Sequence, residues 1–149
     1  AGTGREHENS TDAADILSYY IPANKLEVGD IVRIKVFCTV VDNNSSDTLT
    51  PILKFGGSAI ATGAALDVND DDIVYAWADV HVTATGSSGT MTAISELRTD
   101  ALGATVIIGQ TALTSMDTTG TLQVVLNVDW SAAHADNEVR IDAASIELV

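Results

Sequence analysis

The feature that most constrains the fold is a two-residue alternation of apolar and polar side chains in several long segments. Residues 30–41 and 120–130 show it most clearly. Because successive side chains of a β-strand point to opposite faces, the pattern predicts strands with one face in a core and the other toward solvent. The side chains expected to be buried between two sheets are Val32, Ile34, Val36, Leu122, Val124, Leu126 and Val128.

Turn-forming clusters separate the strand-like segments, for example at residues 42–47, 56–57 and 86–89. No segment of ten or more residues has a 3.6-residue amphipathic pattern, so crossover helices and a parallel sheet are not expected. The remaining fold classes are antiparallel β-sandwiches and jelly rolls, and we expect eight or nine strands. Pro51 predicts an edge strand or a bulge at residues 49–55, because proline has no N–H. A slip in the alternation near Ala143 and Ala144 predicts a β-bulge.

The chain has 149 residues, which suits a single domain. Residues 1–15 are polar and lack an apolar period, so we expect a flexible arm, or an extended segment that orders on contact, before one domain over residues 16–149. These first residues show no signal-peptide core. No apolar run approaches the roughly 20 residues that span a bilayer.

The charge balance is strongly negative, with 21 acidic residues against 7 lysines and arginines and a net charge of −14. Such a surface repels phosphate backbones and anionic lipids, so neither a nucleic acid nor a membrane is expected as a partner. Aspartate outnumbers glutamate, and lysine is rare. This composition suits concentrated salt, and a halophilic or marine source is our hypothesis.

Motifs of catalysis are missing from the sequence. It contains no G-x-S-x-G elbow, no P-loop and no dinucleotide fingerprint. His7, His81 and His134 lack partners at zinc-site spacing, and Cys38 lies in an apolar strand where a small buried side chain is usual. We therefore expect no enzyme and no cofactor. A hydrolase on a sandwich fold is a third alternative, since only the fold assembles a Ser-His-Asp triad.

Two features could bind ligands. The acidic run at residues 69–72 offers Asp70 and Asp72 as candidate calcium ligands, although it lacks the EF-hand pattern and a solvated turn also explains it. Tyr75 and Trp77 share one face of the strand predicted at residues 73–85, opposite small apolar residues. They could form a subunit interface or, with Trp130, a sugar-stacking platform; with reversed parity they would lie in the core.

Several segments together resemble a group of virion proteins from tailed double-stranded DNA viruses of bacteria and archaea. They are residues 17–26 (LSYYIPANKL), 29–34 (GDIVRI), 48–57 (TLTPILKFGG), 74–77 (VYAW) and 141–149. The resemblance extends over most of residues 16–149, and its motifs are structural rather than catalytic. It implies a jelly-roll-type antiparallel β-sandwich, and it identifies no active-site residues in this chain.

The resemblance also implies a role at the virion surface, after assembly in the host cytoplasm. The expected function is that of a capsid decoration, fibre or tail-surface protein. We expect a homo-oligomer, specifically a trimer, bound to a major capsid protein or another virion protein, with the arm of residues 1–15 as anchor. The alternative function is a receptor- or glycan-binding module at a fibre or tail tip.

Overall fold

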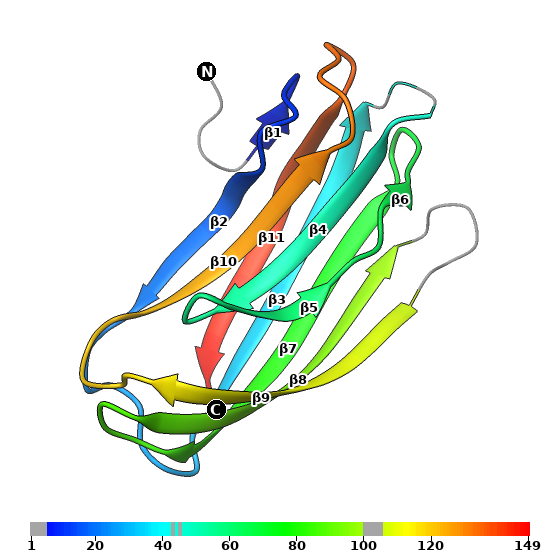
Figure 1. Cartoon of the computed structure of the whole chain (residues 1–149). Helices are drawn as coiled ribbons and strands as arrows, with labels where there is room; N and C mark the ends of the chain where they lie inside the picture. Colours follow the sequence, from blue (N-terminus) through cyan, green and yellow to red (C-terminus); the bar gives the residue numbers. More distant parts are fainter. Residues whose placement is uncertain (1–5, 43, 45, 100–105) are drawn as a thin grey trace.

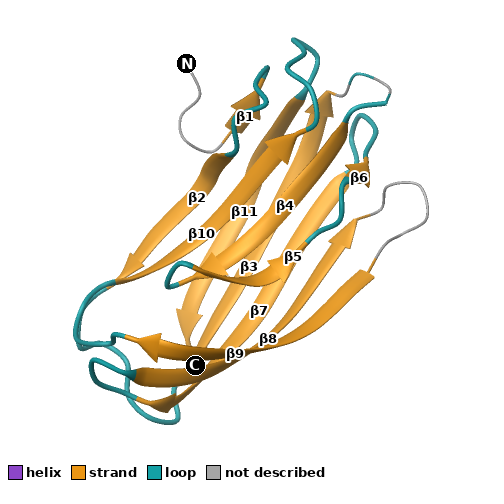
Figure 2. Ribbon diagram, viewed as in Figure 1, coloured by secondary structure: helices purple, strands orange, loops and turns teal. Residues whose placement is uncertain are grey.

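The computed structural model describes residues 6–42, 44, 46–99 and 106–149. These residues form strands and loops, and no helix long and apolar enough to cross a membrane is found among them (Figure 2). The eleven strands are β1 (Glu6–Glu8), β2 (Ala14–Ile21), β3 (Ile31–Asp42), β4 (Thr48–Phe55), β5 (Ser58–Thr62), β6 (Leu66–Asp67), β7 (Ile73–Ala84), β8 (Gly89–Thr99), β9 (Val106–Met116), β10 (Leu122–Trp130) and β11 (Glu138–Leu148).

Two antiparallel sheets pack face to face (Figure 1). The six-stranded sheet has the order β1-β11-β3-β7-β8-β9, and the five-stranded sheet has the order β2-β10-β4-β5, with β6 also paired to β4. Consecutive strands β2, β3 and β4 lie in alternate sheets, as do β9, β10 and β11. The predicted jelly-roll-type sandwich is thus confirmed. The strand number exceeds the predicted eight or nine, since β1 and β6 are too short to show a period.

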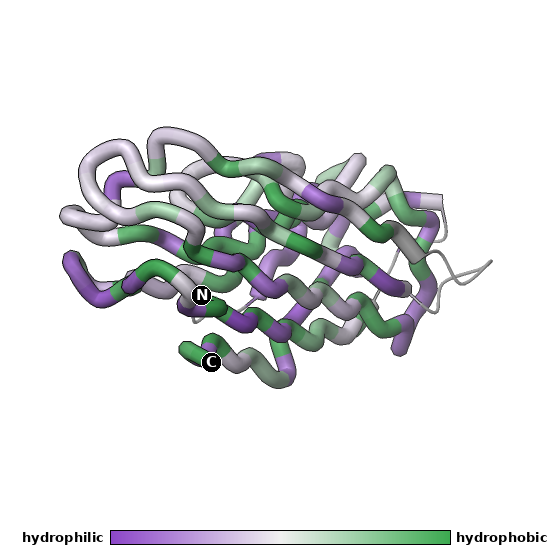
Figure 3. Tube along the Cα trace, turned by 90° about the horizontal axis from the view of Figure 1, so that it is seen from below, coloured by the Kyte–Doolittle hydropathy of each residue, from purple (hydrophilic) through white to green (hydrophobic). Residues whose placement is uncertain are grey.

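The core lies between the sheets and follows the predicted parity. Hydropathy alternates along several strands of the backbone trace (Figure 3). All seven side chains expected in the core are buried, and Ile34, Val36 and Val124 are completely inaccessible. The large side chains Trp130, Phe55 and Leu53 fill the same space. Each sheet therefore buries one face and leaves the other accessible.

Pro51 lies in an interior strand rather than at the predicted edge, and the register of β4 against β5 shifts between Leu53 and Lys54, two residues further on. The Pro51 carbonyl accepts a hydrogen bond from the Gly63 N–H at 2.8 Å, so the backbone of Pro51 faces the β5 side. On this side β5 pairs with Ile52 to Phe55, and β6 pairs with Thr48 and Leu49. Pro51 lies between the segments of β4 that pair with β5 and with β6. Neither neighbouring strand pairs with Pro51, so its missing N–H breaks no strand-to-strand hydrogen bond on this side.

The bulge predicted near Ala143 and Ala144 is confirmed in β11. The register of β11 against β3 shifts between Ile141 and Ala143. Asp142 is thus the extra residue. Beyond the shift, the end of β11 pairs regularly with β3 as far as Leu148 and Val32.

Residues 6–15 belong to the segment expected to be a flexible arm or an extended segment that orders on contact, and they include strand β1 and the start of β2. Glu6, His7 and Glu8 pair with Arg140, Val139 and Glu138 of β11. His7 is 6% exposed, and its carbonyl accepts a hydrogen bond from Trp130 Nε1 at 3.4 Å. Strand β2 already begins at Ala14. The rest of the expected arm, residues 1–5, lies outside the described residues.

Two of the motifs in the resemblance form turns. Asn24, in the IPAN segment, has φ of 57°, and its N–H donates to the Thr118 carbonyl at 2.8 Å. Gly56 and Gly57 join β4 to β5 with φ of 55° and 85°. Asparagine and glycine are the residues that adopt positive φ most easily, so these positions have a structural reason for their identity.

Candidate contact surface on the six-stranded sheet

Strand β7 presents aromatic side chains on the outer face of the six-stranded sheet. Its buried residues are small, and Ala76, Ala78 and Val80 are at most 1% exposed. Tyr75 and Trp77 lie on the opposite face and are partly buried by their neighbours on the sheet. This is the predicted parity, and the reversed alternative, with both aromatic residues in the core, is wrong.

A third aromatic residue joins this face from β3. Phe37 is directly opposite Tyr75 in the β3–β7 register, and their ring centroids are 4.5 Å apart. The Phe37 side chain is 44% exposed. We call Phe37, Tyr75 and Trp77 the aromatic patch. Sequence analysis did not select Phe37, although its place among the outward-facing Arg33, Lys35 and Thr39 was a usable signal.

Charged pairs border the aromatic patch on two sides. Toward β8, Tyr75 is opposite Arg98 and Trp77 is opposite Glu96, and the Arg98 and Glu96 side chains form an ion pair. Burial raises the pKa of the Tyr75 hydroxyl, Glu96 adds to the rise, and Arg98 opposes it. The phenol is therefore a neutral donor and acceptor at physiological pH.

The second charged pair joins β3 to β7. Arg33 Nε and Nη2 donate to the two carboxylate oxygens of Asp79 at 2.9 and 2.8 Å. Hydrogen bonding to Arg33 lowers the pKa of Asp79, against a smaller opposing effect of burial. This two-point contact holds both side chains flat on the sheet beside the patch.

Three exposed isoleucines lie on the rest of the outer face, among polar and charged residues. Ile73, Ile94 and Ile108 are 42%, 41% and 75% exposed. A hollow of about 200 Å³ lies beside Phe37, where Lys35 and residues 143–145 form its walls at the β11 bulge. The face can receive an aromatic or apolar contact at the patch, with the Arg98–Glu96 and Arg33–Asp79 pairs beside it as hydrogen-bonding groups.

The acidic loop does not form a cluster of carboxylates. The Asp72 carboxylate accepts a hydrogen bond from the Asn69 N–H at 2.7 Å, and the Asp72 N–H donates to the Asn69 carbonyl at 3.1 Å. Asp71 has φ of 66°. Within the described residues, no group of three or more His, Cys, Asp or Glu side chains could hold a metal ion. Asp70 and Asp72 thus belong to a turn that β3 anchors, since Val40 exchanges hydrogen bonds with the loop.

The other residues considered from sequence do not assemble into a common site, although Trp130 and His7 are in contact. Trp130 is 1% exposed, so it cannot belong to a sugar-stacking platform with Tyr75 and Trp77. His7 is the buried middle residue of β1, His134 contacts Asp136 in a loop, and His81 lies on the outer face of β7. Cys38 is buried, and desolvation raises the pKa of its thiol to about 12.

These features describe a β-sandwich with an accessible aromatic face. No protein-family model matches the chain, and no curated protein matches its sequence. Among solved structures, it is similar to one described as "EclA C-terminal domain; sugar-binding protein", with 10% identity and a TM-score of 0.45 over 99% of this chain and 80% of the other. A similarity this remote carries no inference about ligand or function.

Proposed function

We propose that this chain is a non-enzymatic structural protein of the surface of a tailed-virus particle, and that it assembles as a homotrimer through the aromatic patch. The observation that carries the proposal is the accessibility of Phe37 beside Tyr75 and Trp77 on one sheet face. The sequence resemblance to virion surface proteins is the reason for proposing a virus particle and a trimer. In such an assembly the protein binds the shell and stabilises it by burying area across the joints between shell subunits.

The physical support is that exposing aromatic and aliphatic side chains to water is unfavourable. Monomeric proteins rarely expose large contiguous apolar surfaces, and aromatic side chains are enriched at subunit interfaces. The same face also exposes Ile94 and Ile108, which the Arg33–Asp79 and Arg98–Glu96 ion pairs separate from the patch. Covering this face with a second subunit would remove aromatic and aliphatic surface from water together, and it would also cover the two ion pairs that lie between them.

Light scattering on the isolated protein tests the assembly. We expect a trimer for the unaltered chain and dissociation for Trp77→Ala. Tyr20→Ala is the matched control, because Tyr20 is 58% exposed on β2 of the other sheet. The control variant should remain a trimer. Circular dichroism must show that both variants are folded.

Two outcomes would contradict the proposed interface. A monomeric unaltered protein would remove the trimer, and a trimer that survives Trp77→Ala would place the interface elsewhere. If Trp77→Ala does not fold, Phe37→Ser provides the same test on a residue that is 44% exposed.

The second candidate function is glycan binding by the same face. Tyr75 and Trp77 lie two residues apart on one strand, and Glu96 and Arg98 offer hydrogen-bonding groups beside them. Trp130 is buried, so a change in tryptophan emission on adding a sugar would report Trp77. Saturable quenching by a defined oligosaccharide, lost in Trp77→Ala, would favour this function over assembly.

A further inference from the structure

An open hollow lies at the end of the sandwich where β2, β4 and β9 finish and β10 begins. Its volume is about 370 Å³, within the range of roughly 300–1,000 Å³ that is typical of small-molecule sites. Strand β2 contributes Tyr20, the turn from β4 to β5 contributes Gly56 and Gly57, and residues 115–117 and 120–123 form the rest of the wall. These segments meet at the lower left of Figure 1. All of them belong to the described part of the chain.

Tyr20 and Gln123 form one side of the hollow as a cross-strand pair. They are opposite each other in the register of β2 and β10, and their neighbours Ile21 and Leu122 are buried. Because successive side chains point to opposite faces, Tyr20 and Gln123 face outward, and Tyr20 is 58% exposed. Gln123 Nε2 donates to Ser18 Oγ at 2.8 Å. This bond orients the amide, whose oxygen and second N–H hydrogen are left to bond a ligand.

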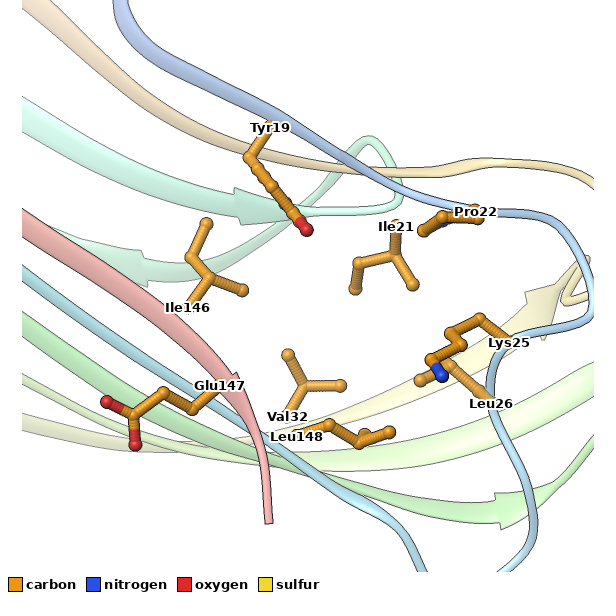
Figure 4. Close-up of a pocket in the computed structure, with 9 residues that line it drawn as sticks. All are labelled: Tyr19, Ile21, Pro22, Lys25, Leu26, Val32, Ile146, Glu147 and Leu148. Carbon is orange, nitrogen blue, oxygen red and sulfur yellow. The ribbon is translucent and has the colours of Figure 1, made fainter.

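The preceding residue, Tyr19, provides a comparison for Tyr20. Its side chain points into a different hollow, an apolar groove of about 180 Å³ between the two sheets (Figure 4). Ile21 and Ile146 lie beside it there. Tyr19 is 47% exposed, so the two tyrosines share a strand and a similar accessibility but line different hollows.

The opposite side of the hollow is a loop that is held against the β4–β5 turn. A bulge in the β8–β9 register bends the end of β9 at Ser115, which has φ of 58°. A Cβ atom on Gly56 would lie only 2.7 Å from Met116 Sδ, so the Met116 side chain packs directly on the backbone of the turn. The Asn24 N–H donates to the Thr118 carbonyl at 2.8 Å and ties the loop to the chain after β2. The sides of the hollow are thus fixed relative to each other, as a binding site requires.

Asp117 is the one charged residue among the described residues that line the hollow. Its Oδ1 accepts hydrogen bonds from the Thr119 hydroxyl and N–H at 2.6 and 3.0 Å. These bonds lower the pKa of Asp117, so the side chain is a carboxylate at neutral pH. Because no lysine, arginine or histidine is part of this wall, a phosphate or a carboxylate would be repelled.

A neutral sugar ring matches this combination of groups. One face of such a ring consists of C–H groups and can lie on an aromatic side chain, while the hydroxyls at its edge donate to carboxylates and amide oxygens. A hydroxyl that donates to a carboxylate forms a stronger bond than one between neutral groups. An ammonium ion would also suit a carboxylate beside an aromatic ring, but it would leave the Gln123 amide unused.

We propose that this hollow binds a neutral saccharide, with one sugar ring on Tyr20 and its hydroxyls bonded to Asp117 and Gln123. The hollow lies on the five-stranded sheet, whereas the aromatic patch lies on the six-stranded sheet. The site is therefore distinct from the surface proposed for assembly and from the glycan contact considered for the same surface. Tyr20 variants accordingly leave the test of the trimer unaffected.

A nuclear magnetic resonance titration of the ¹⁵N-labelled full chain tests this proposal. The probes are the methyl glycosides of glucose, galactose and mannose. We expect at least one of them to cause saturable shifts of the Gly57, Thr121 and Gln123 amides, with a dissociation constant below about 20 mM. The methyl glycoside of the corresponding uronic acid keeps the ring and adds a carboxylate. It should bind at least about tenfold more weakly, because Asp117 repels it.

Variants of the protein identify the contacts. Tyr20→Ala should weaken binding at least about tenfold, whereas Tyr20→Phe keeps the ring and should bind normally. Tyr19→Ala, on the other face of β2, is the matched control and should also bind normally. Asp117→Asn keeps an acceptor for the Thr119 bonds but removes the charge, and we expect at least about fivefold weaker binding. Its control is Asp136→Asn, because Asp136 lies in the loop at the far end of β10.

Three results would overturn the proposal. The first is no saturable binding of any of the three glycosides up to about 50 mM. The second is saturable binding that shifts the amides of the aromatic patch instead, or that is unchanged in Tyr20→Ala or in Asp117→Asn. The third is binding of tetramethylammonium chloride at the same amides as tightly as the best glycoside, since the hollow would then be a cation site. If one of the two variants does not fold, the other decides.

Discussion

Ile34 of β3 and Leu126 of β10 lie in opposite sheets, and their side chains are 0% and 1% exposed. Each lies inside a strand whose alternation is regular, so its inward direction follows from the local period alone. Phe37 shows the limit of the same argument. The period places Phe37 on the outer face, but only the β3–β7 register brings its ring against Tyr75.

Truncating the core side chains should therefore be costly. We expect Ile34→Ala or Leu126→Ala to lower the free energy of unfolding by about 2–5 kcal/mol, through lost burial and the cavity left behind. Urea unfolding measures the change. Ile108→Ala is the matched control, because Ile108 is 75% exposed, and should cost under about 0.5 kcal/mol. A core variant as stable as this control would show that the parity is wrong.

Cys38 should be chemically inert in the folded protein. Burial raises the pKa of its thiol to about 12, from an ordinary value of 9.0, so the thiolate is scarce at pH 8. We expect disulfide-exchange reagents to label Cys38 at least about a hundredfold more slowly in the native state than in urea. Equal labelling rates in the two states would indicate that β3 opens readily.

At the scale of elements, long strands follow their sequence period, whereas short ones depend on their partners. Strands β3, β7 and β10 were predicted from alternation alone. Strand β1 has three residues and no period; it exists because β11 offers an edge beside the buried Trp130. Pro51 is accommodated in an interior strand because β4 changes partner there. Neither contact is visible in a local window of sequence.

The docking of β1 should depend on pH through His7. Burial lowers the pKa of His7 below 6.5, and the nearby carboxylates of Asp129 and Asp12 only partly oppose this. His7 Nε2 finds no hydrogen-bond partner among the described residues. A lowered pKa means that the docked state is fully stable above pH 6.5 and loses stability as pH falls through the folded-state pKa.

Hydrogen exchange can measure this dependence. After correction for intrinsic exchange, we expect lower protection of the Asn9 amide, which donates to Asn137, at pH 5 than at pH 7.5. His7→Leu should abolish the difference. Protection that increases on acidification would mean that attraction to Asp129 outweighs burial.

At the scale of the whole molecule, the net charge of −14 is spread over a sandwich with few cations. Its described ion pairs include Arg33 with Asp79, Arg98 with Glu96, and Arg140 with Asp142. Most of the carboxylates therefore add to a repulsion that acts on the folded state more than on the expanded unfolded chain.

Salt should stabilise the protein for this reason. We expect the melting temperature to rise between low salt and about 1 M sodium chloride, because the Debye length falls to about 3 Å. Comparing sodium chloride with sodium sulfate at equal ionic strength separates screening from the surface exclusion of sulfate. A flat or falling melting temperature in sodium chloride would contradict the hypothesis of a halophilic or marine source.

The sequence left open whether Tyr75 and Trp77 face outward or into the core, but by itself it determined the all-β class, the inward parity of β3 and β10, and the β11 bulge. Each of these depends on a two-residue period that is local to one strand. The tertiary structure decided which strands are neighbours. It paired β1 with β11, placed Phe37 against Tyr75, and buried Trp130 next to the His7 carbonyl. Strand order depends on contacts between residues far apart in the chain, and a local period contains no information about them.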